Sequence, residues 1–273
     1  MPPLAELLPL IAVLAATGAF AGVLAGLLGV GGGIVLVPVF YLVFTGAGYG
    51  GPDLMAVCLA TSLATIIFTS ARSVMSHNKK GAVDWEILRR WGPGIAVGAL
   101  IGVWAVGELG SATLQLIFGV LGVCIALYFA FGKTEWRFGD EMPGGFARAI
   151  VSPIIGLLSV LMGIGGGSLG VPLMTLYGTP IHRAVATAAG FGMLIAVPSV
   201  LGFLVVVAEG NVPPLTLGQV NIPAFLVVIC MTLITAPWGV KLAHALPVRP
   251  LRMIFAVFIA LMALNMLRTG LGV

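Results

Sequence analysis

Two short glycine runs are the residues of this chain whose spacing points most directly to chemistry. The first holds Gly29, Gly31, Gly32 and Gly33, and the second holds Gly163, Gly165, Gly166 and Gly167. A proline follows each run at the same distance, at Pro38 and Pro172. Three consecutive glycines interrupt a helix, and at membrane depth such freed backbone is tolerated only inside protein or beside a water-filled cavity. We therefore expect each run to lie inside the protein or to line a water-filled cavity.

An anion is the ligand that this pattern favours. The segments after the runs, residues 34–44 and 168–177, can restart a helix whose first N–H groups point back toward the glycines. Those N–H groups and the helix dipole attract negative charge, and glycine allows close approach because it has no Cβ. The alternative is that the glycines only permit close helix packing. We expect packing instead for the glycines spaced four apart, namely Gly18, Gly22 and Gly26, and Gly94, Gly98 and Gly102.

Hydroxyl side chains extend the predicted anion site. Thr61 and Ser62 lie in one apolar stretch, Thr187 lies at the matching position of another, and Ser168 directly follows the second glycine run. Each hydroxyl can donate to an oxyanion, although a hydroxyl in a membrane helix also bonds carbonyls of its own helix or of a neighbour. Pro198 and Pro237 fall inside long apolar stretches and predict kinks. Together with Pro38 and Pro172 they are the candidate hinges.

Composition places these residues in a membrane. The chain has 273 residues, of which 60% are hydrophobic and 8% charged, whereas soluble domains are about a quarter charged. A spanning helix needs about 20 apolar residues. Such stretches run at about Leu54–Met75, Ile87–Val106, Thr113–Phe131, Ala184–Val207, Pro223–His244 and Leu251–Leu267. We expect a multi-pass protein of the cell membrane.

The two halves of the sequence repeat one plan. A glycine-broken apolar stretch, at residues 8–45 and again at 149–178, precedes each set of three spans. The predicted fold is all-α, with repeats at 1–131 and 148–273 joined by a cytoplasmic linker at 132–147. If each broken hairpin enters and leaves on one side, each half crosses the membrane three times. The second half is then inverted relative to the first.

Basic residues predict the orientation. Twelve of the thirteen Lys and Arg residues flank alternate loops, and only Arg268 falls outside this set, whereas the loops at 45–53, 107–112 and 208–221 have none. Cytoplasmic loops collect positive charge, so the basic loops are predicted to be cytoplasmic and both termini external. The net charge of +4 then reflects the basic residues of the cytoplasmic loops, and we expect no nucleic-acid partner.

Enzyme motifs are missing from the sequence. No nucleophile elbow, zinc-binding His-Glu-x-x-His or phosphate loop is present, and the three cysteines lie far apart. We therefore expect no enzyme, no metal and no cofactor. All nine acidic residues fall in loops or at span ends, so no carboxylate is expected at the midplane as a proton relay.

The paired glycine runs, the step Ala60, Thr61 and Ser62, and the segment from His77 to Asp84 together resemble the sulfite exporter TauE/SafE family. The resemblance implies a permease that exports sulfite or a small organosulfonate such as sulfoacetate. It places the family glycine motif on both runs and the threonine–serine step on Thr61 and Ser62. In the second half that step reads Thr187 and Ala188, and Asp84 is matched by Asn221, so an asymmetric site is expected. An importer of an inorganic sulfur anion and a membrane sensor or interaction subunit are the alternatives.

Overall fold

The computed structural model describes residues 4–28, 32–132, 137–245 and 248–272. These residues form ten helices and one short β-hairpin. The helices are α1 (Leu4–Leu28), α2 (Gly33–Gly46), α3 (Leu54–Asn78), α4 (Trp85–Glu108), α5 (Ser111–Phe131), α6 (Gly145–Leu161), α7 (Gly167–Leu176), α8 (Ile181–Val205), α9 (Ile222–Ala245) and α10 (Val248–Gly270). The strands β1 (Thr216–Leu217) and β2 (Val220–Asn221) pair antiparallel between α8 and α9. The protein is therefore mostly helical, as expected.

Both glycine runs interrupt an apolar stretch, as the sequence predicts. The first interruption separates α1 from α2, and the second separates α6 from α7. Gly32 immediately precedes α2 with a φ of 73°, a backbone conformation that glycine adopts without strain. Gly29 and Gly31 lie outside the described residues. Pro38 and Pro172 are each the sixth residue of the helix that restarts after the interruption.

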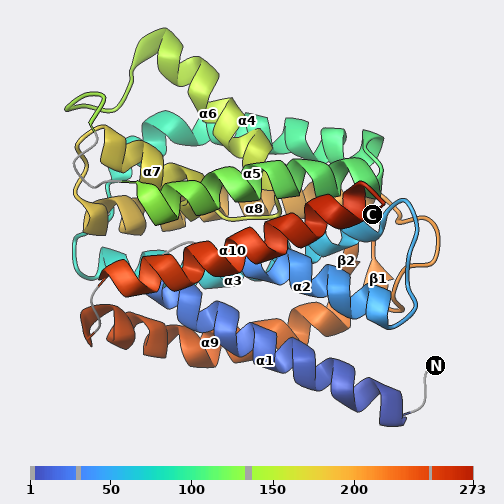
Figure 1. Ribbon diagram of the computed structural model, residues 1–273. Helices are drawn as coiled ribbons and strands as arrows, with labels where there is room; N and C mark the ends of the chain where they lie inside the picture. Colours follow the sequence, from blue (N-terminus) through green and yellow to red (C-terminus); the bar gives the residue numbers. More distant parts are fainter. Residues whose placement is uncertain (1–3, 29–31, 133–136, 246–247, 273) are drawn as a thin grey trace.

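Each broken pair forms a hairpin that enters and leaves at one end of the molecule. The α7 helix ends beside the segment that precedes α6, because the N–H of Phe138 donates to the carbonyl of Leu176 at 2.8 Å. The α1 helix packs along α9, with Gly18 against Val228 and Gly22 against Thr232. Since α9 begins at the end where α2 finishes, α1 starts there too (Figure 1). The α1–α2 hairpin therefore enters from one end of the molecule and the α6–α7 hairpin from the other.

The close helix packing predicted at the glycines spaced four apart is confirmed for those whose contacts the structure describes. A Cβ on Gly94 would overlap Ser152 of α6, and a Cβ on Gly98 would overlap the backbone of Pro153. The same pairing of a hairpin helix with a long helix occurs on the opposite side, between α1 and α9. In Figure 1, α4 and α6 lie at the top of the molecule and α1 and α9 at the bottom, with α3 and α8 between them.

Five of the six predicted spans are helices long and apolar enough to cross a membrane: α3, α4, α5, α8 and residues 222–239 of α9. The sixth falls in α10, whose apolar part within the described side chains, residues 256–270, is shorter. Burial separates the inner helices from the outer ones, since 78% of the apolar window of α3 is buried but only 39% of that of α4. Large apolar side chains such as Trp104 and Trp238 are exposed on the outer helices, as a lipid-facing surface requires. The protein is an all-α, multi-pass membrane protein.

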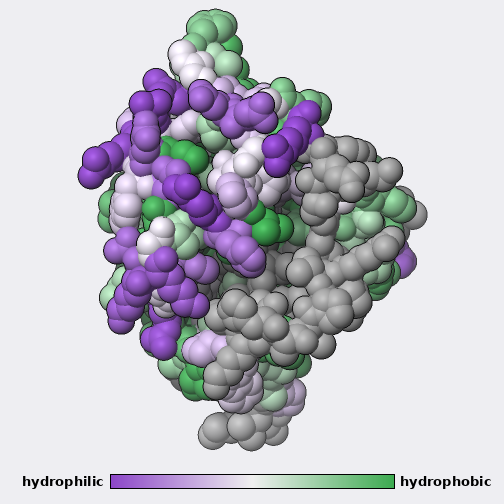
Figure 2. All heavy atoms as spheres, turned by 90° about the vertical axis from the view of Figure 1, so that its left-hand side faces the viewer, coloured by the Kyte–Doolittle hydropathy of each residue, from purple (hydrophilic) through white to green (hydrophobic). Residues whose placement is uncertain are grey.

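Charge gathers at one end of the bundle. The α3–α4 loop, the segment before α6, the α7–α8 loop and the start of α10 all lie at the left of Figure 1, whereas α1 starts and α10 ends at the right. Figure 2 faces the left end and shows hydrophilic residues gathered on the coloured part of this face. Arg90, Arg148 and Arg183 share one surface cavity there. We call this the charged end.

Candidate functional site

The start of α7 combines a buried helix terminus with an unsatisfied hydroxyl. Residues 163–167 are all buried, and Gly166 caps α7 without a side-chain hydrogen bond. Ser168, the second residue of α7, is 1% exposed, and its Oγ has no hydrogen-bond partner. The first N–H groups of a helix have no partner within the helix, so this terminus presents several donors. Buried donors of this kind are normally satisfied, and a small anion would satisfy them.

The two hairpins touch at their interruptions. A Cβ placed on Gly33 would lie 2.6 Å from the carbonyl oxygen of Gly163 and 2.8 Å from Cδ1 of Ile66. A Cβ on Gly163, whose φ is 59°, would lie 3.0 Å from Cα of Leu59. Only glycine allows backbones to approach this closely. The structure therefore brings the start of α2 against the end of α6, beside the central helix α3.

Ser62 holds the second interruption to α3. Its hydroxyl donates to the carbonyl oxygen of Gly163 at 2.7 Å, and the pair is buried. A matching contact holds the other side of the interruption against α8, because a Cβ on Gly166 would overlap Cβ of Phe191. Gly192 of α8 in turn packs against Ser70 and Ile66 of α3. Ser62, Gly33, Gly163 and Gly166 thus gather around the α3–α8 pair.

Thr61 lies next to Ser62 and has different partners. Its hydroxyl donates to the carbonyl of Val57 in its own helix at 2.7 Å and accepts the backbone N–H of Asn221 at 2.9 Å. The Asn221 side chain in turn accepts the N–H of Ala224 at 3.1 Å, so Asn221 caps α9. In this conformation the Thr61 proton bonds its own helix, which is the alternative that the sequence left open.

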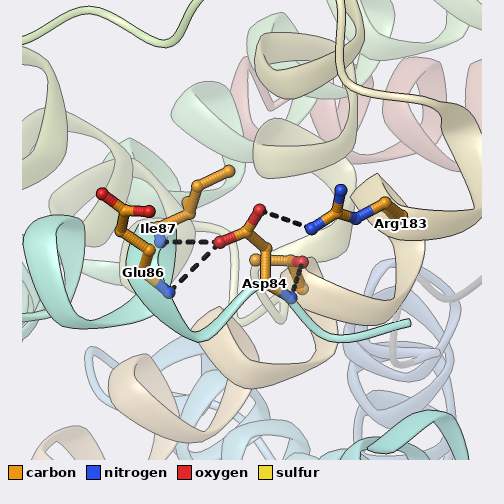
Figure 3. Close-up of polar contacts among 5 residues, drawn as sticks. Asp84, Glu86, Ile87 and Arg183 are labelled. Atoms are coloured by element: carbon orange, nitrogen blue, oxygen red, sulfur yellow. Dashed lines mark hydrogen bonds and ion pairs between the residues drawn. The ribbon is translucent and has the colours of Figure 1, made fainter. Parts of the chain in front are cut away.

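Thr187 makes the corresponding junction at the charged end. Its hydroxyl oxygen accepts the backbone N–H of Asp84 at 2.9 Å. The Asp84 carboxylate caps α4 by accepting the N–H groups of Glu86 and Ile87, each at 3.1 Å. Its second oxygen accepts from the Arg183 guanidinium at 2.9 Å (Figure 3). Asp84 therefore ties α4 to the first turn of α8, and sequence reasoning did not anticipate the pairing with Arg183.

The charged end holds a cavity of about 400 Å³ around this ion pair. Its lining includes Asp84, Glu86, Arg90, Arg148 and Arg183, together with residues of the segment before α6 and the end of α7. Arginines and carboxylates both face it, so the cavity is polar and mixed in charge. It lies at the surface and away from the glycine interruptions.

The structure separates the remaining candidates from this cluster. Thr187 belongs to the junction at the charged end, and α8 and α9 run without interruption through Pro198 and Pro237. Sequence reasoning missed Ser159, which is fully buried four residues before Gly163 and has an Oγ without a partner. The only feature of the sequence that pointed to Ser159 was its position four residues before the second glycine run.

Comparison with known proteins fits this architecture. The family model described as "Sulfite exporter TauE/SafE" matches residues 14–266. The chain belongs to this family. A "Probable membrane transporter protein" of Haemophilus influenzae is 32% identical over 251 residues, which cover 91% of this chain and 95% of that protein. A relative of the same description from Methanocaldococcus jannaschii is 27% identical over 96% of this chain and 97% of its own length.

A further relative shows the same family sequence within a longer protein. The "Probable membrane transporter protein MamO" of Magnetospirillum gryphiswaldense is 27% identical over 91% of this chain, but only 43% of that protein is covered. No solved structure gives a significant match. Family membership and the helical architecture together make the chain a membrane transporter, with a small-molecule substrate and a lipid surround.

Proposed function

We propose that the protein carries a small anion, with sulfite or an organosulfonate such as sulfoacetate as the substrate, out of the cell across the cell membrane. The observation that carries this proposal is the buried start of α7, where Gly166 provides no side-chain cap and the Ser168 hydroxyl has no partner. A helix N-terminus of this kind favours negative charge. The family to which the chain belongs, described as sulfite exporters, supports the choice of a sulfur oxyanion.

The proposed site lies between the two hairpins. Its residues are Gly29, Gly31, Gly32, Gly33, Thr61, Ser62, Gly163, Gly165, Gly166, Gly167, Ser168 and Thr187. The contact between Gly33 and Gly163 supports a shared site, because it places the start of α2 directly against the second interruption. Thr61 and Thr187 act in this proposal by holding the helices that surround the site, through their bonds to Asn221 and Asp84.

We propose further that the chain is two inverted repeats, residues 1–131 and 148–273, joined by a linker at 132–147. The two threonine junctions support this, because each repeat supplies the threonine that binds the capping residue of the other. Gly81 and Gly218, three residues before Asp84 and Asn221, have matching φ values of 64° and 59°. The two hairpins also enter from opposite ends of the bundle, as inverted repeats require. Alternating access would then follow from one repeat moving against the other.

Charge supports export. If the charged end faces the cytoplasm, an anion that leaves the cell gains about 2.3 kcal/mol per charge per 100 mV of inside-negative potential. The buried polar side chains of the described residues are all uncharged, so the proposal needs no proton relay inside the membrane. A coupling ion would be required only for import.

The test is flux into proteoliposomes that contain the purified native chain. Radiolabelled sulfite, sulfoacetate and sulfate are supplied in turn, with protein-free liposomes as the blank. The proposal expects saturable flux of sulfite or sulfoacetate well above the blank. Flux no greater than the blank for every anion would contradict it and would favour a sensor or interaction subunit.

A further inference from the structure

The second hairpin carries two buried hydroxyls that no protein group satisfies. Ser159 in α6 is fully buried and Ser168 in α7 is 1% exposed, and neither Oγ has a hydrogen-bond partner. The two serines flank the same interruption, residues 162–166, one on each side. A buried hydroxyl without a partner costs about 1–3 kcal/mol. Two such groups at one interruption are hydrogen-bond donors available to a bound ligand.

Other buried hydroxyls of the protein show how unusual Ser159 is. Ser152, Ser199 and Thr61 each donate to the carbonyl four residues earlier in their own helix, at 2.7–2.8 Å. Ser159 stands two residues before the end of α6 and makes no such bond, although several turns of helix precede it. Ser168 stands at the second position of α7 and has no preceding turn to bond. Both hydroxyl protons are therefore free for an acceptor.

The first hairpin lacks these groups. Aligning Gly29 with Gly163 places Ala25 opposite Ser159 and Ile34 opposite Ser168, and Ile34 is 1% exposed. The two interruptions share their glycines but not their hydroxyls. A ligand between the hairpins consequently meets side-chain donors on one side only.

We infer that Ser159 and Ser168 select the substrate of the proposed site by donating hydrogen bonds to two oxygens of a sulfur oxyanion. This inference rests on the proposed function and assigns its specificity to the second hairpin. A strongly hydrated oxyanion loses many hydrogen bonds when it enters a buried site, and hydroxyl donors replace some of them. A weakly hydrated anion such as thiocyanate needs fewer replacements, so the hydroxyls discriminate between the two classes.

The experiment compares Ser159→Ala, Ser168→Ala and the native chain in proteoliposomes, with radiolabelled sulfite and thiocyanate as substrates. Ser199→Ala is the matched control, because Ser199 is fully buried but its hydroxyl bonds Ile195. The inference expects about a tenfold loss of sulfite flux in each of the first two variants, since one hydrogen bond to a charged group is lost. Thiocyanate flux should change less than twofold, and Ser199→Ala should leave the ratio of the two fluxes unchanged.

Two results separate failure of the inference from failure of the proposed function. If the native chain carries sulfite and both serine variants carry it equally well, the hydroxyls do not select the substrate and the inference is overturned. Equal losses of sulfite and thiocyanate flux overturn it too, because they indicate a structural role. If the native chain carries neither anion, the proposed function fails and the inference fails with it. Thermal unfolding of each purified variant in detergent confirms that the flux comparison concerns folded protein.

Discussion

The backbone N–H of Asp84 donates to the hydroxyl of Thr187 at 2.9 Å, and this bond joins the start of α4 to the first turns of α8. Its counterpart at the other end joins Asn221 to Thr61 at the same distance. In each junction the threonine comes from one half of the chain and the capping residue from the other. The halves are therefore tied together by hydrogen bonds from backbone N–H groups to threonine hydroxyls in addition to apolar packing.

Removing either threonine hydroxyl should lower stability. Thr187→Val and Thr61→Val keep the side-chain shape but leave the N–H of Asp84 or Asn221 without an acceptor. A buried donor without a partner costs about 1–3 kcal/mol. Each variant should therefore unfold at a lower temperature in detergent, and the loss should be larger for Thr61→Val, because the bond to Asn221 is buried and the bond to Asp84 is only partly buried. Thr17→Val is the control, because the exposed Thr17 hydroxyl bonds only Val13 of its own helix. Equal unfolding temperatures for all three variants would contradict the claim that the two threonine hydroxyls stabilise the fold.

Asp84 should matter more as a helix cap than as a charge. Its carboxylate bonds the N–H groups of Glu86 and Ile87, while Arg183, its ion-pair partner, has a side chain that is 53% exposed. An exposed ion pair contributes well under about 1 kcal/mol, whereas loss of a cap costs about 1 kcal/mol.

The comparison of Asp84→Asn with Asp84→Ala tests this ranking. Asparagine keeps the cap, as Asn221 does at the start of α9, so Asp84→Asn should lower the unfolding temperature less than Asp84→Ala. The difference between Asp84→Asn and the native chain should also shrink as salt is added, because salt screens the ion pair. Equal losses in the two variants would assign the effect to charge.

The contact between hairpins should tolerate no side chain. In Gly33→Ala the new Cβ would lie 2.6 Å from the carbonyl oxygen of Gly163, so the interruptions must separate. We expect sulfite flux to fall at least tenfold and the unfolding temperature to drop. Gly107→Ala is the control, since its Cβ would meet no atom within 4 Å, and it should behave as the native chain. Native flux in Gly33→Ala would mean that the hairpins do not need to touch.

Orientation can be checked by labelling single cysteines. Cys58, Cys124 and Cys230 are free and are first replaced by alanine. A membrane-impermeant maleimide should then label Asn211→Cys in intact cells, but should label Lys80→Cys only after the cells are opened, because Lys80 lies at the charged end and Asn211 at the other. The reverse pattern would place the charged end outside and remove the electrical argument for export.

Sequence patterns predict the interruptions and spans of this fold because both follow from local composition. Three glycines in a row end a helix, and a long apolar stretch makes a span, whatever the rest of the chain does. The sequence also marked Thr61, Ser62 and Thr187 as polar groups at matching positions. It could not assign their partners, since the bond from Ser62 to Gly163 depends on how far α6 extends beside α3.

Ser159 illustrates the same limit. A serine near the end of an apolar helix normally bonds its own backbone, and nothing in its neighbours along the chain says otherwise. Only the packing of α6 shows that its hydroxyl is buried and without a partner. The pairing of Asp84 with Arg183 was equally hidden, because 99 residues separate them.

The most direct test of the anion site is voltage-driven sulfite flux in proteoliposomes that contain Gly32→Leu or Gly166→Leu. Leucine at Gly32 would have to adopt a φ of 73°, and at Gly166 it would overlap Phe191, while Gly107→Leu projects into open space and is the control. We expect the native chain and the control to carry sulfite at a rate that follows the imposed voltage, and both site variants, recovered as folded protein, to lose that flux. Unchanged flux in the two folded site variants would contradict the placement of the substrate between the glycine interruptions.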